Sequence, residues 1–138
     1  MWISARWSRR FPLPIVSAMS LASNAVGAYG ERRAAEYLVN EAGMRLLARN
    51  WRCAHGEIDI IALDADALVF VEVKTRRHRE FGPPAEAVVA AKRLRLRRLA
   101  VQWLAEHPGH VEEIRFDVVS VVCPGRGPAR VEHLRAAF

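Results

Sequence analysis

The chain has 138 residues, enough for one domain with a buried core, and it carries 21 lysines and arginines against 15 aspartates and glutamates. No apolar run approaches the roughly 18–20 residues of a membrane-spanning helix, so we expect a soluble protein with no membrane partner. All but two of the cations are arginine. Arginine pairs well with phosphate, so the charge suits a polyanion, although many basic proteins bind nothing specific.

The two cysteines, Cys53 and Cys123, are far apart in the sequence and form no CxxC pair. Without a secretory signal, this predicts reduced thiols in a cytoplasmic protein.

Residues 1–22 are expected to lie outside the fold. They are rich in arginine and contain no acid, which is also typical of targeting presequences. They have no adequate apolar core for a secretory signal. We favour a disordered extension, or a start codon placed too early with Met19 as the true start, so that residues 23–138 form a single domain.

The first predicted element is a helix that begins at Ser23 or Asn24, which can cap it, and stops at Gly43. Glu31 shares a face of this helix with three apolar residues at i+3, i+4 and i+7: Ala34, Ala35 and Leu38. One carboxylate therefore lies along an inward-looking stripe, unless it sits at the edge of the stripe and reaches water, as glutamate usually does.

Three strands are expected next, at 44–53 and around the apolar runs Ile58–Leu63 and Leu68–Val73. A long helix over Pro84–His107 follows. Its expected buried side consists of Val89, Leu96, Leu99, Ala100, Trp103 and Leu104. Its other face carries Lys92, Arg93, Arg95, Arg97 and Arg98.

A further strand at 113–123 and a short edge strand within 129–138 complete the predicted order. This order, α-β-β-β-α-β with a short final strand, predicts the α/β class, with a mixed sheet between helices.

The charged residues of the second and third strands lie far from their connecting turn. A two-residue loop at Ala65–Asp66 would place Asp59 opposite Glu72, and Glu57 opposite Lys74, on one face of the sheet. The opposite face would then carry Ile58, Ile60, Val71 and Val73. A three-residue loop would instead put Asp59 and Glu72 on opposite faces, and hydrophobicity does not decide between the two registers.

Two opposed carboxylates at the edge of an apolar sheet would repel each other, and one would tend to take up a proton. A divalent cation resolves the conflict, because Mg²⁺ prefers carboxylate oxygens and water, to which the Val73 carbonyl could add a ligand. Lys74 returns to the same face as Glu72, where it could stabilise charge developing on a phosphate. The alternative is a surface ion-pair cluster that contributes little energy.

The segments GEIDIIA and VFVEVKTR, preceded by GAYGERRAAEYL and followed by FGPPAEAV, AK and RFDVV, closely resemble the YraN-like family of small bacterial proteins. The resemblance covers the chain from about Gly27 to the C-terminus. It implies a compact member of the PD-(D/E)xK nuclease superfamily, related to archaeal Holliday-junction resolvases, with a three-layer restriction-endonuclease-like core.

The superfamily pattern implies a catalytic set of four residues. Asp59 and Glu72 correspond to metal ligands for Mg²⁺ or Mn²⁺, and Lys74 corresponds to the catalytic lysine. Glu31 matches the first-helix acid that completes such sites. The first motif reads ID instead of PD, which leaves the aspartate intact, and Glu57 belongs to the family motif without a clear role beyond pairing with Lys74.

Nucleic-acid contacts are expected from the basic residues near this site. Lys92 also matches a family position, which implies a phosphate contact, and the RRHR run directly follows the catalytic strand as either a phosphate grip or a solvated charge run. The expected contacts are Arg76, Arg77, Arg79, Lys92, Arg93, Arg95 and Arg97. We interpret His55 as a turn residue in preference to a ligand, and Asp117 as a structural residue paired with Arg115.

The sequence thus predicts a Mg²⁺-dependent phosphodiesterase that acts on DNA in preference to RNA, with branched or repair intermediates as candidate substrates. Whether two subunits pair as a homodimer to cut both strands stays open. A non-catalytic nucleic-acid-binding module of the same fold is the alternative. A purely structural protein would leave the opposed carboxylates Asp59 and Glu72 as an unexplained cost.

Overall fold

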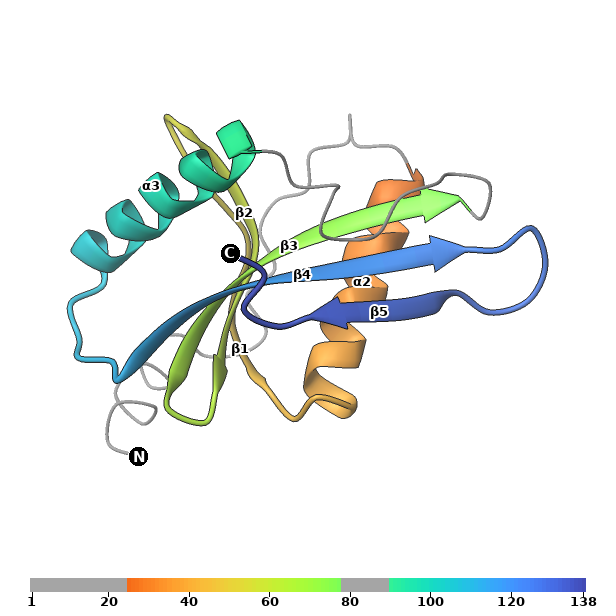
Figure 1. Ribbon diagram of the computed structural model, residues 1–138, viewed down its shortest axis with the longest axis horizontal. Helices are drawn as coiled ribbons and strands as arrows, with labels where there is room; N and C mark the ends of the chain where they lie inside the picture. The colour runs from red at the N-terminus through yellow and green to blue at the C-terminus, as the bar shows by residue number, and fades with distance from the viewer. Residues whose placement is uncertain (1–24, 78–89) are drawn as a thin grey trace.

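The described part of the chain forms a five-stranded mixed sheet with one helix packed on each face (Figure 1). The computed structural model describes residues 25–77 and 90–138. Outside these residues lie the expected helix cap at Ser23 or Asn24, the expected helical stretch 84–89, and Arg79. The described elements are α2 (Ala25–Asn40), β1 (Arg45–Cys53), β2 (Gly56–Asp64), β3 (Ala67–Arg77), α3 (Ala90–Glu106), β4 (Glu113–Cys123) and β5 (Arg130–Leu134).

The strands follow one another across the sheet in chain order. Neighbours are antiparallel except β3 and β4, which are parallel, so the chain through α3 forms the crossover that a parallel pair requires. The short β5 lies at the edge beside β4, as predicted. This architecture confirms the predicted α/β class and is consistent with a restriction-endonuclease-like core. Within the described residues, no helix is long and apolar enough to cross a membrane.

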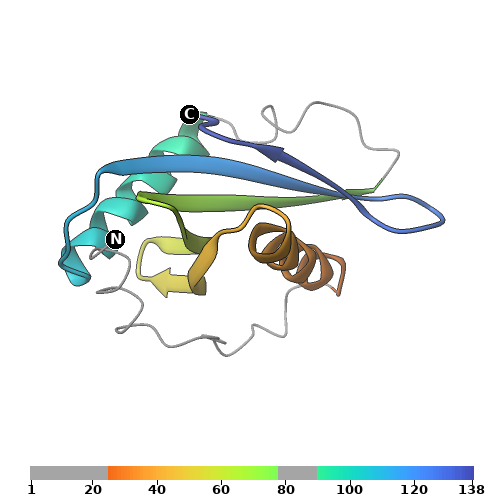
Figure 2. The same cartoon turned by 90° about the horizontal axis from the view of Figure 1, so that it is seen from below.

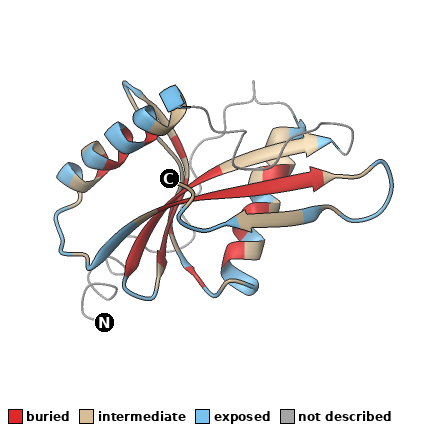
Figure 3. Ribbon diagram, in the orientation of Figure 1, coloured by how far each residue is buried: buried red, intermediate tan, exposed pale blue. Residues whose placement is uncertain are grey.

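The core is divided into two clusters by the sheet. Trp103 of α3 packs against Phe70 on one face, with ring centroids 5.9 Å apart, and Leu38 of α2 belongs to the cluster on the other face. Figure 2 shows α2 lying on one face of the long strands, and Figure 3 shows the buried positions on the inward sides of both helices. The predicted buried side of α3 is confirmed at Leu96, Leu99, Ala100 and Trp103.

A buried ionic network ties β4 to β5 and the C-terminal tail. Asp117 is fully buried and accepts hydrogen bonds from Arg115 at 2.9 and 3.0 Å and from the backbone N–H of Ala136 at 3.0 Å. Nε2 of His133 lies 2.7 Å from Oδ2 of Asp117. The hydroxyl group of Tyr37, from α2, lies 3.2 Å from Nδ1 of the same imidazole ring. The expected pairing of Asp117 with Arg115 is therefore confirmed.

We expect the contribution of this network to folding stability to depend on pH. Burial raises the pKa of Asp117, but hydrogen bonds from His133 and Arg115 outweigh it and hold the pKa below its ordinary value. The ionised carboxylate therefore contributes stability that is complete above the unfolded pKa of about 3.9 and is lost as the pH falls through the lower folded value. Asp117→Asn should cost about 3 kcal/mol near neutral pH, measured by chemical denaturation. The deficit should shrink in acid, and an equal deficit at all pH values would contradict this assignment.

Candidate metal and nucleic-acid site

The sheet opens at the site because β2 and β3 separate. They pair from their turn only as far as Ile60 with Val71. Beyond that point β2 continues beside β1, and β3 continues beside β4. The observed register confirms a two-residue loop, in which Ala65 has a φ of 53°. The direct pairing of Asp59 with Glu72 is absent from this ladder, however, because the strands have already diverged.

The separation of β2 from β3 also means that one residue, Ile58, does not lie on the expected face of the sheet. Ile60, Val71 and Val73 pack on the α2 side of the sheet, as expected. Ile58 instead belongs to the cluster on the α3 side, with Phe70. Once β2 has left β3 it follows the twist of β1, so its side chains rotate relative to those of β3.

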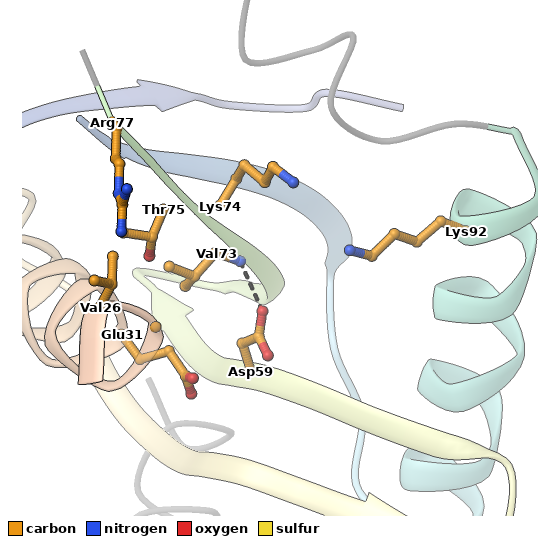
Figure 4. Close-up of a pocket in the computed structure, with 9 residues that line it drawn as sticks. Val26, Glu31, Asp59, Val73, Lys74, Thr75, Arg77 and Lys92 are labelled. Atoms are coloured by element: carbon orange, nitrogen blue, oxygen red, sulfur yellow. Dashed lines mark hydrogen bonds between the residues drawn. The ribbon is translucent and has the colours of Figure 1, made fainter. Parts of the chain in front are cut away.

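Asp59 lies where the two strands separate. Its Oδ2 accepts a hydrogen bond of 2.8 Å from the backbone N–H of Val73, which takes the place of a strand–strand bond (Figure 4). Burial, followed by the nearby charge of Glu72, raises the pKa of Asp59 well above its ordinary value. The ionised form of this carboxylate is therefore costly, and a bound cation would stabilise it.

A cavity of about 510 Å³ opens beside Asp59. It is lined by Glu31 from α2, by Lys74 from β3 and by Lys92 from α3. Figure 4 shows the two lysines extending toward the same space, with Glu31 on the other side of Asp59. Three of the four residues expected to be catalytic thus line one cavity, although they come from three separate elements.

Glu72, the fourth, is buried beside this cavity and does not line it. Its Oε1 forms an ion pair with Nζ of Lys92, and its charge acts on Asp59. The structure therefore gives Lys92, which we expected to contact phosphate, a carboxylate partner. Glu57, which we considered as a partner for Lys74, pairs instead with Arg52 of β1, with Nε and Oε2 2.5 Å apart.

Glu31 is positioned by an asparagine that sequence reasoning missed. The Asn50 side chain hydrogen-bonds Glu31, and Asn50 adopts a φ of 52°, a conformation that asparagine tolerates better than most residues. Burial, and then the charge of Glu57, raises the pKa of Glu31 above its ordinary value. Oε1 of Glu31 is buried without a hydrogen-bond partner among the described residues. The available signal was an asparagine inside an otherwise strand-like run.

Comparison with known proteins places these residues in a family. Residues 30–121 match a family described as uncharacterised protein family UPF0102. The chain belongs to this family. UPF0102 is the YraN family of predicted nucleases, so the resemblance noted from the sequence is confirmed. The matched stretch contains all four expected catalytic residues: Glu31, Asp59, Glu72 and Lys74.

Similar proteins from three other organisms carry the name of this family. The UPF0102 protein of Beutenbergia cavernae is 56% identical over 114 residues, which is 83% of this chain and 96% of the relative. That of Nocardia farcinica is 57% identical over 115 residues, 83% of this chain and 89% of the relative. A UPF0102 protein of Frankia casuarinae is 51% identical over 117 residues, 85% of this chain and 98% of the relative.

In this UPF0102 chain, α2 approaches β3 closely at Gly30. A Cβ atom at that position would lie 1.8 Å from Oγ1 and 2.9 Å from Cβ of Thr75. Gly30 directly precedes Glu31, and Thr75 lines the cavity. The missing side chain therefore sets how closely Glu31 lies to β3, a role that sequence reasoning did not assign.

We expect Gly30→Ala to force α2 away from β3 and to destabilise the protein by about 1–3 kcal/mol, the usual cost of overpacking. Chemical denaturation measures this cost. Thr75→Ala should recover part of the loss in the double variant, because it removes Oγ1 and Cγ2 but leaves Cβ in place. Strictly additive effects of the two substitutions would show that they do not meet at this contact.

The expected phosphate contacts on β3 separate into different environments. Arg77 lines the cavity. Arg76 points elsewhere: its side chain is 11% exposed and its Nη2 lies 3.5 Å from Glu132 of β5. Arg76 is thus held in an ion pair, and its contact with phosphate stays a prediction.

The basic residues of α3 also lie in different environments. Arg97 lies over the ring of Phe116, with 4.8 Å from Cζ to the ring centroid, and Arg93 lies over Phe138 at 5.4 Å. Both guanidinium groups therefore pack against aromatic rings. Arg95 lies on another side of the helix and is exposed.

The residues fit a magnesium ion that is held by few protein ligands. Within residues 25–77 and 90–138, no three His, Cys, Asp or Glu side chains are already grouped as a metal site. Mg²⁺ commonly uses one or two carboxylates together with waters and substrate phosphates, and Asp59 and Glu72 supply two. The buried, unpaired oxygen of Glu31 offers a third acceptor nearby.

Proposed function

We propose that the protein is a nuclease, dependent on Mg²⁺ or Mn²⁺, that hydrolyses phosphodiester bonds in DNA. The observation that carries this proposal is Asp59, a half-buried carboxylate at the point where the sheet opens, which faces a cavity lined by Glu31 and Lys74. Its raised pKa comes from burial and from the charge of Glu72. Asp59 and Glu72 are two carboxylates that repel each other and lie near Lys74. Such an arrangement suits cation-assisted chemistry on an anionic substrate.

Each side chain has a distinct role in this proposal. Asp59 and Glu72 hold the cation, which, when bound, polarises the phosphate and lowers the pKa of a coordinated water. Lys74 presents a compact positive charge to the phosphate as negative charge develops on it. The unpaired Oε1 of Glu31 accepts a hydrogen bond from the attacking water and so orients it.

Lys92 would have to give up its ion pair with Glu72 before that carboxylate could hold a cation. A cation held by that carboxylate would leave the Lys92 ammonium without its partner beside Lys74, where both lysines face the same space (Figure 4). A released ammonium is then available for a substrate phosphate. The ion pair thus reconciles the observed partner of Lys92 with the phosphate contact expected from the family.

A nucleic-acid-binding module without catalysis is the second candidate. It is favoured by two observations: Glu72 already forms an ion pair with Lys92, and the described residues contain no ready-made group of three metal ligands. In that case the cavity would bind phosphate through its lysines alone. Binding would then persist without any divalent cation.

A cleavage screen over single-stranded, duplex and branched DNA, and over RNA, with Mg²⁺ or Mn²⁺ separates the two candidates. Cutting of at least one DNA substrate by the wild type, lost with EDTA and lost in Asp59→Asn, is the expected result. Tight binding without cutting of any substrate would favour the binding module. Cutting that persists in Asp59→Asn would point to a contaminating nuclease.

A further inference from the structure

A second cavity, of about 560 Å³, lies between the β1–β2 turn and α3. Its lining differs from that of the first cavity, with no acidic residue and no member of the expected catalytic set. The lining residues are His55, Ala91, Leu94, Arg95 and Arg98. A concave surface whose only charged or ionisable groups are basic is suited to an anion.

Contacts between the turn and the helix fix the shape of this cavity. Gly56 packs closely on α3, since a Cβ atom there would lie 3.5 Å from Leu99 and 3.7 Å from Cδ of Arg95. Sγ of Cys53 lies 3.4 Å from Gln102 of α3, and it also accepts a hydrogen bond from the backbone N–H of His55 at 3.4 Å. The histidine and the two arginines are therefore brought together by two packed elements.

Arg95 and Arg98 also differ from the other basic residues nearby. Lys92 is paired with Glu72, and Arg97 packs over Phe116. In the described part of the chain, no carboxylate lies within ion-pair distance of Arg95 or Arg98, and both are exposed. They stand three residues apart on one face of α3, so their charges act on the same volume.

We propose that this cavity binds the sugar–phosphate backbone of the nucleic acid at a distance from the phosphate that is cut. The inference rests on the proposed function and extends it by giving the substrate a second anchoring point. Lys92 lines the first cavity, and Arg95 and Arg98 follow it by about 4.5 and 9 Å along the helix axis. A single strand that runs along α3 can therefore reach both cavities, with the exposed Leu94 offering apolar surface to the sugars.

The contact should carry little sequence preference. Guanidinium groups bind phosphate oxygens without reading the bases, and no aromatic ring lines the cavity except the imidazole of His55. The substrate must instead be long enough to extend from one cavity to the other. Strand length is therefore the property that the second cavity selects.

The test compares binding of fluorescently labelled single-stranded DNA from about 2 to about 20 nucleotides. At about 3.4 Å or more per nucleotide, this range begins below the length that spans the two cavities and extends beyond common site sizes. Anisotropy is measured in EDTA, so that no cutting occurs, over a series of salt concentrations. The test variant is Arg95→Ala/Arg98→Ala. The control is Arg126→Ala/Arg130→Ala, which removes the same charge from exposed positions near the β4–β5 turn.

Wild type and control should both gain affinity once the strand is long enough to span the two cavities. Arg95→Ala/Arg98→Ala should bind the shortest strands like wild type but lose this gain. Its slope of log affinity against log salt for long strands should fall by about 1.4, because two phosphate contacts on a single strand are lost.

The remaining outcomes separate the inference from the function on which it rests. If Arg95→Ala/Arg98→Ala keeps the length-dependent gain and the salt slope, the second cavity is wrongly assigned and the proposed function stands. If the control loses as much as the test variant, only net charge matters and the assignment is also wrong. If the wild type binds single-stranded DNA of no length, the second cavity is wrongly assigned, and if it also cuts no substrate in the cleavage screen, the proposed function fails as well.

Discussion

Asp59→Asn and Glu72→Gln should each abolish tight binding of Mg²⁺ and Mn²⁺ while the protein stays folded. Both substitutions keep the shape of the side chain but remove its negative charge. A hard cation such as Mg²⁺ requires that charge. Asparagine at position 59 can still accept the hydrogen bond from Val73, so the opening of the sheet should be preserved. Isothermal titration with Mn²⁺ measures the loss.

The same titration has a control variant, Lys92→Met, whose cation affinity should increase. Lys92→Met removes the ammonium that occupies Glu72, so cation affinity should rise by about tenfold or more, as expected for the loss of a like charge a few ångströms away. General damage to the fold cannot raise affinity. Equal affinity in wild type, Asp59→Asn and Glu72→Gln would refute the metal assignment.

Asp59→Asn should also raise the melting temperature of the metal-free protein. Burial and the charge of Glu72 raise the pKa of Asp59 in the folded state, so ionisation of this group lowers stability as the pH rises from the unfolded pKa through the folded one. A neutral amide avoids that cost above the folded pKa. Glu72→Gln should show no such gain, because it leaves Lys92 without its partner.

Local patterns in the sequence were sufficient for the elements and for part of the site. Alternation of apolar and charged residues, with turn residues between Asp64 and Ala67, predicted the hairpin and, with a two-residue loop, its observed register. The separation of β2 from β3 was not predictable in this way. Past Ile60 and Val71, each strand keeps one apolar residue, Ile58 or Val73, among charged neighbours. This pattern suits a continued pair equally well, and the separation depends on which neighbour each strand follows across the sheet.

Contacts between residues distant in the sequence could not be predicted from local patterns. Arg76 and Arg97 were assigned to phosphate because they are basic and near the site, but Glu132 and Phe116, which contact them, come from other strands. Spacing within one element carries no information on such partners. The same limit hid the close packing of Gly30 on Thr75, which joins a helix to a strand 45 positions later.

Lys74→Arg should fold normally and still bind nucleic acid, but lose most of its cleavage activity. This chain uses arginine for all but two of its 21 cations, so a position that needs only positive charge would more often have been arginine. Lysine is a compact point charge on a flexible stem, whereas arginine is a wide planar fork. In the cavity beside Asp59 and Glu31, the fork should displace water or misplace the phosphate, and small misplacements cost about 100-fold in rate.

Lys92→Arg is the matched comparison for this prediction, because it makes the same substitution at the other lysine of the cavity. Arginine can keep both the ion pair with Glu72 and a contact with phosphate, so its effect on cleavage should be mild. Single-turnover assays with saturating enzyme isolate the chemical step from binding. Near-wild-type cleavage by Lys74→Arg would show that Lys74 supplies only charge, whereas equal and severe losses in both variants would mean that the cavity excludes arginine by size at either position. Only a large loss confined to Lys74→Arg assigns the compact ammonium of Lys74 to the reacting phosphate.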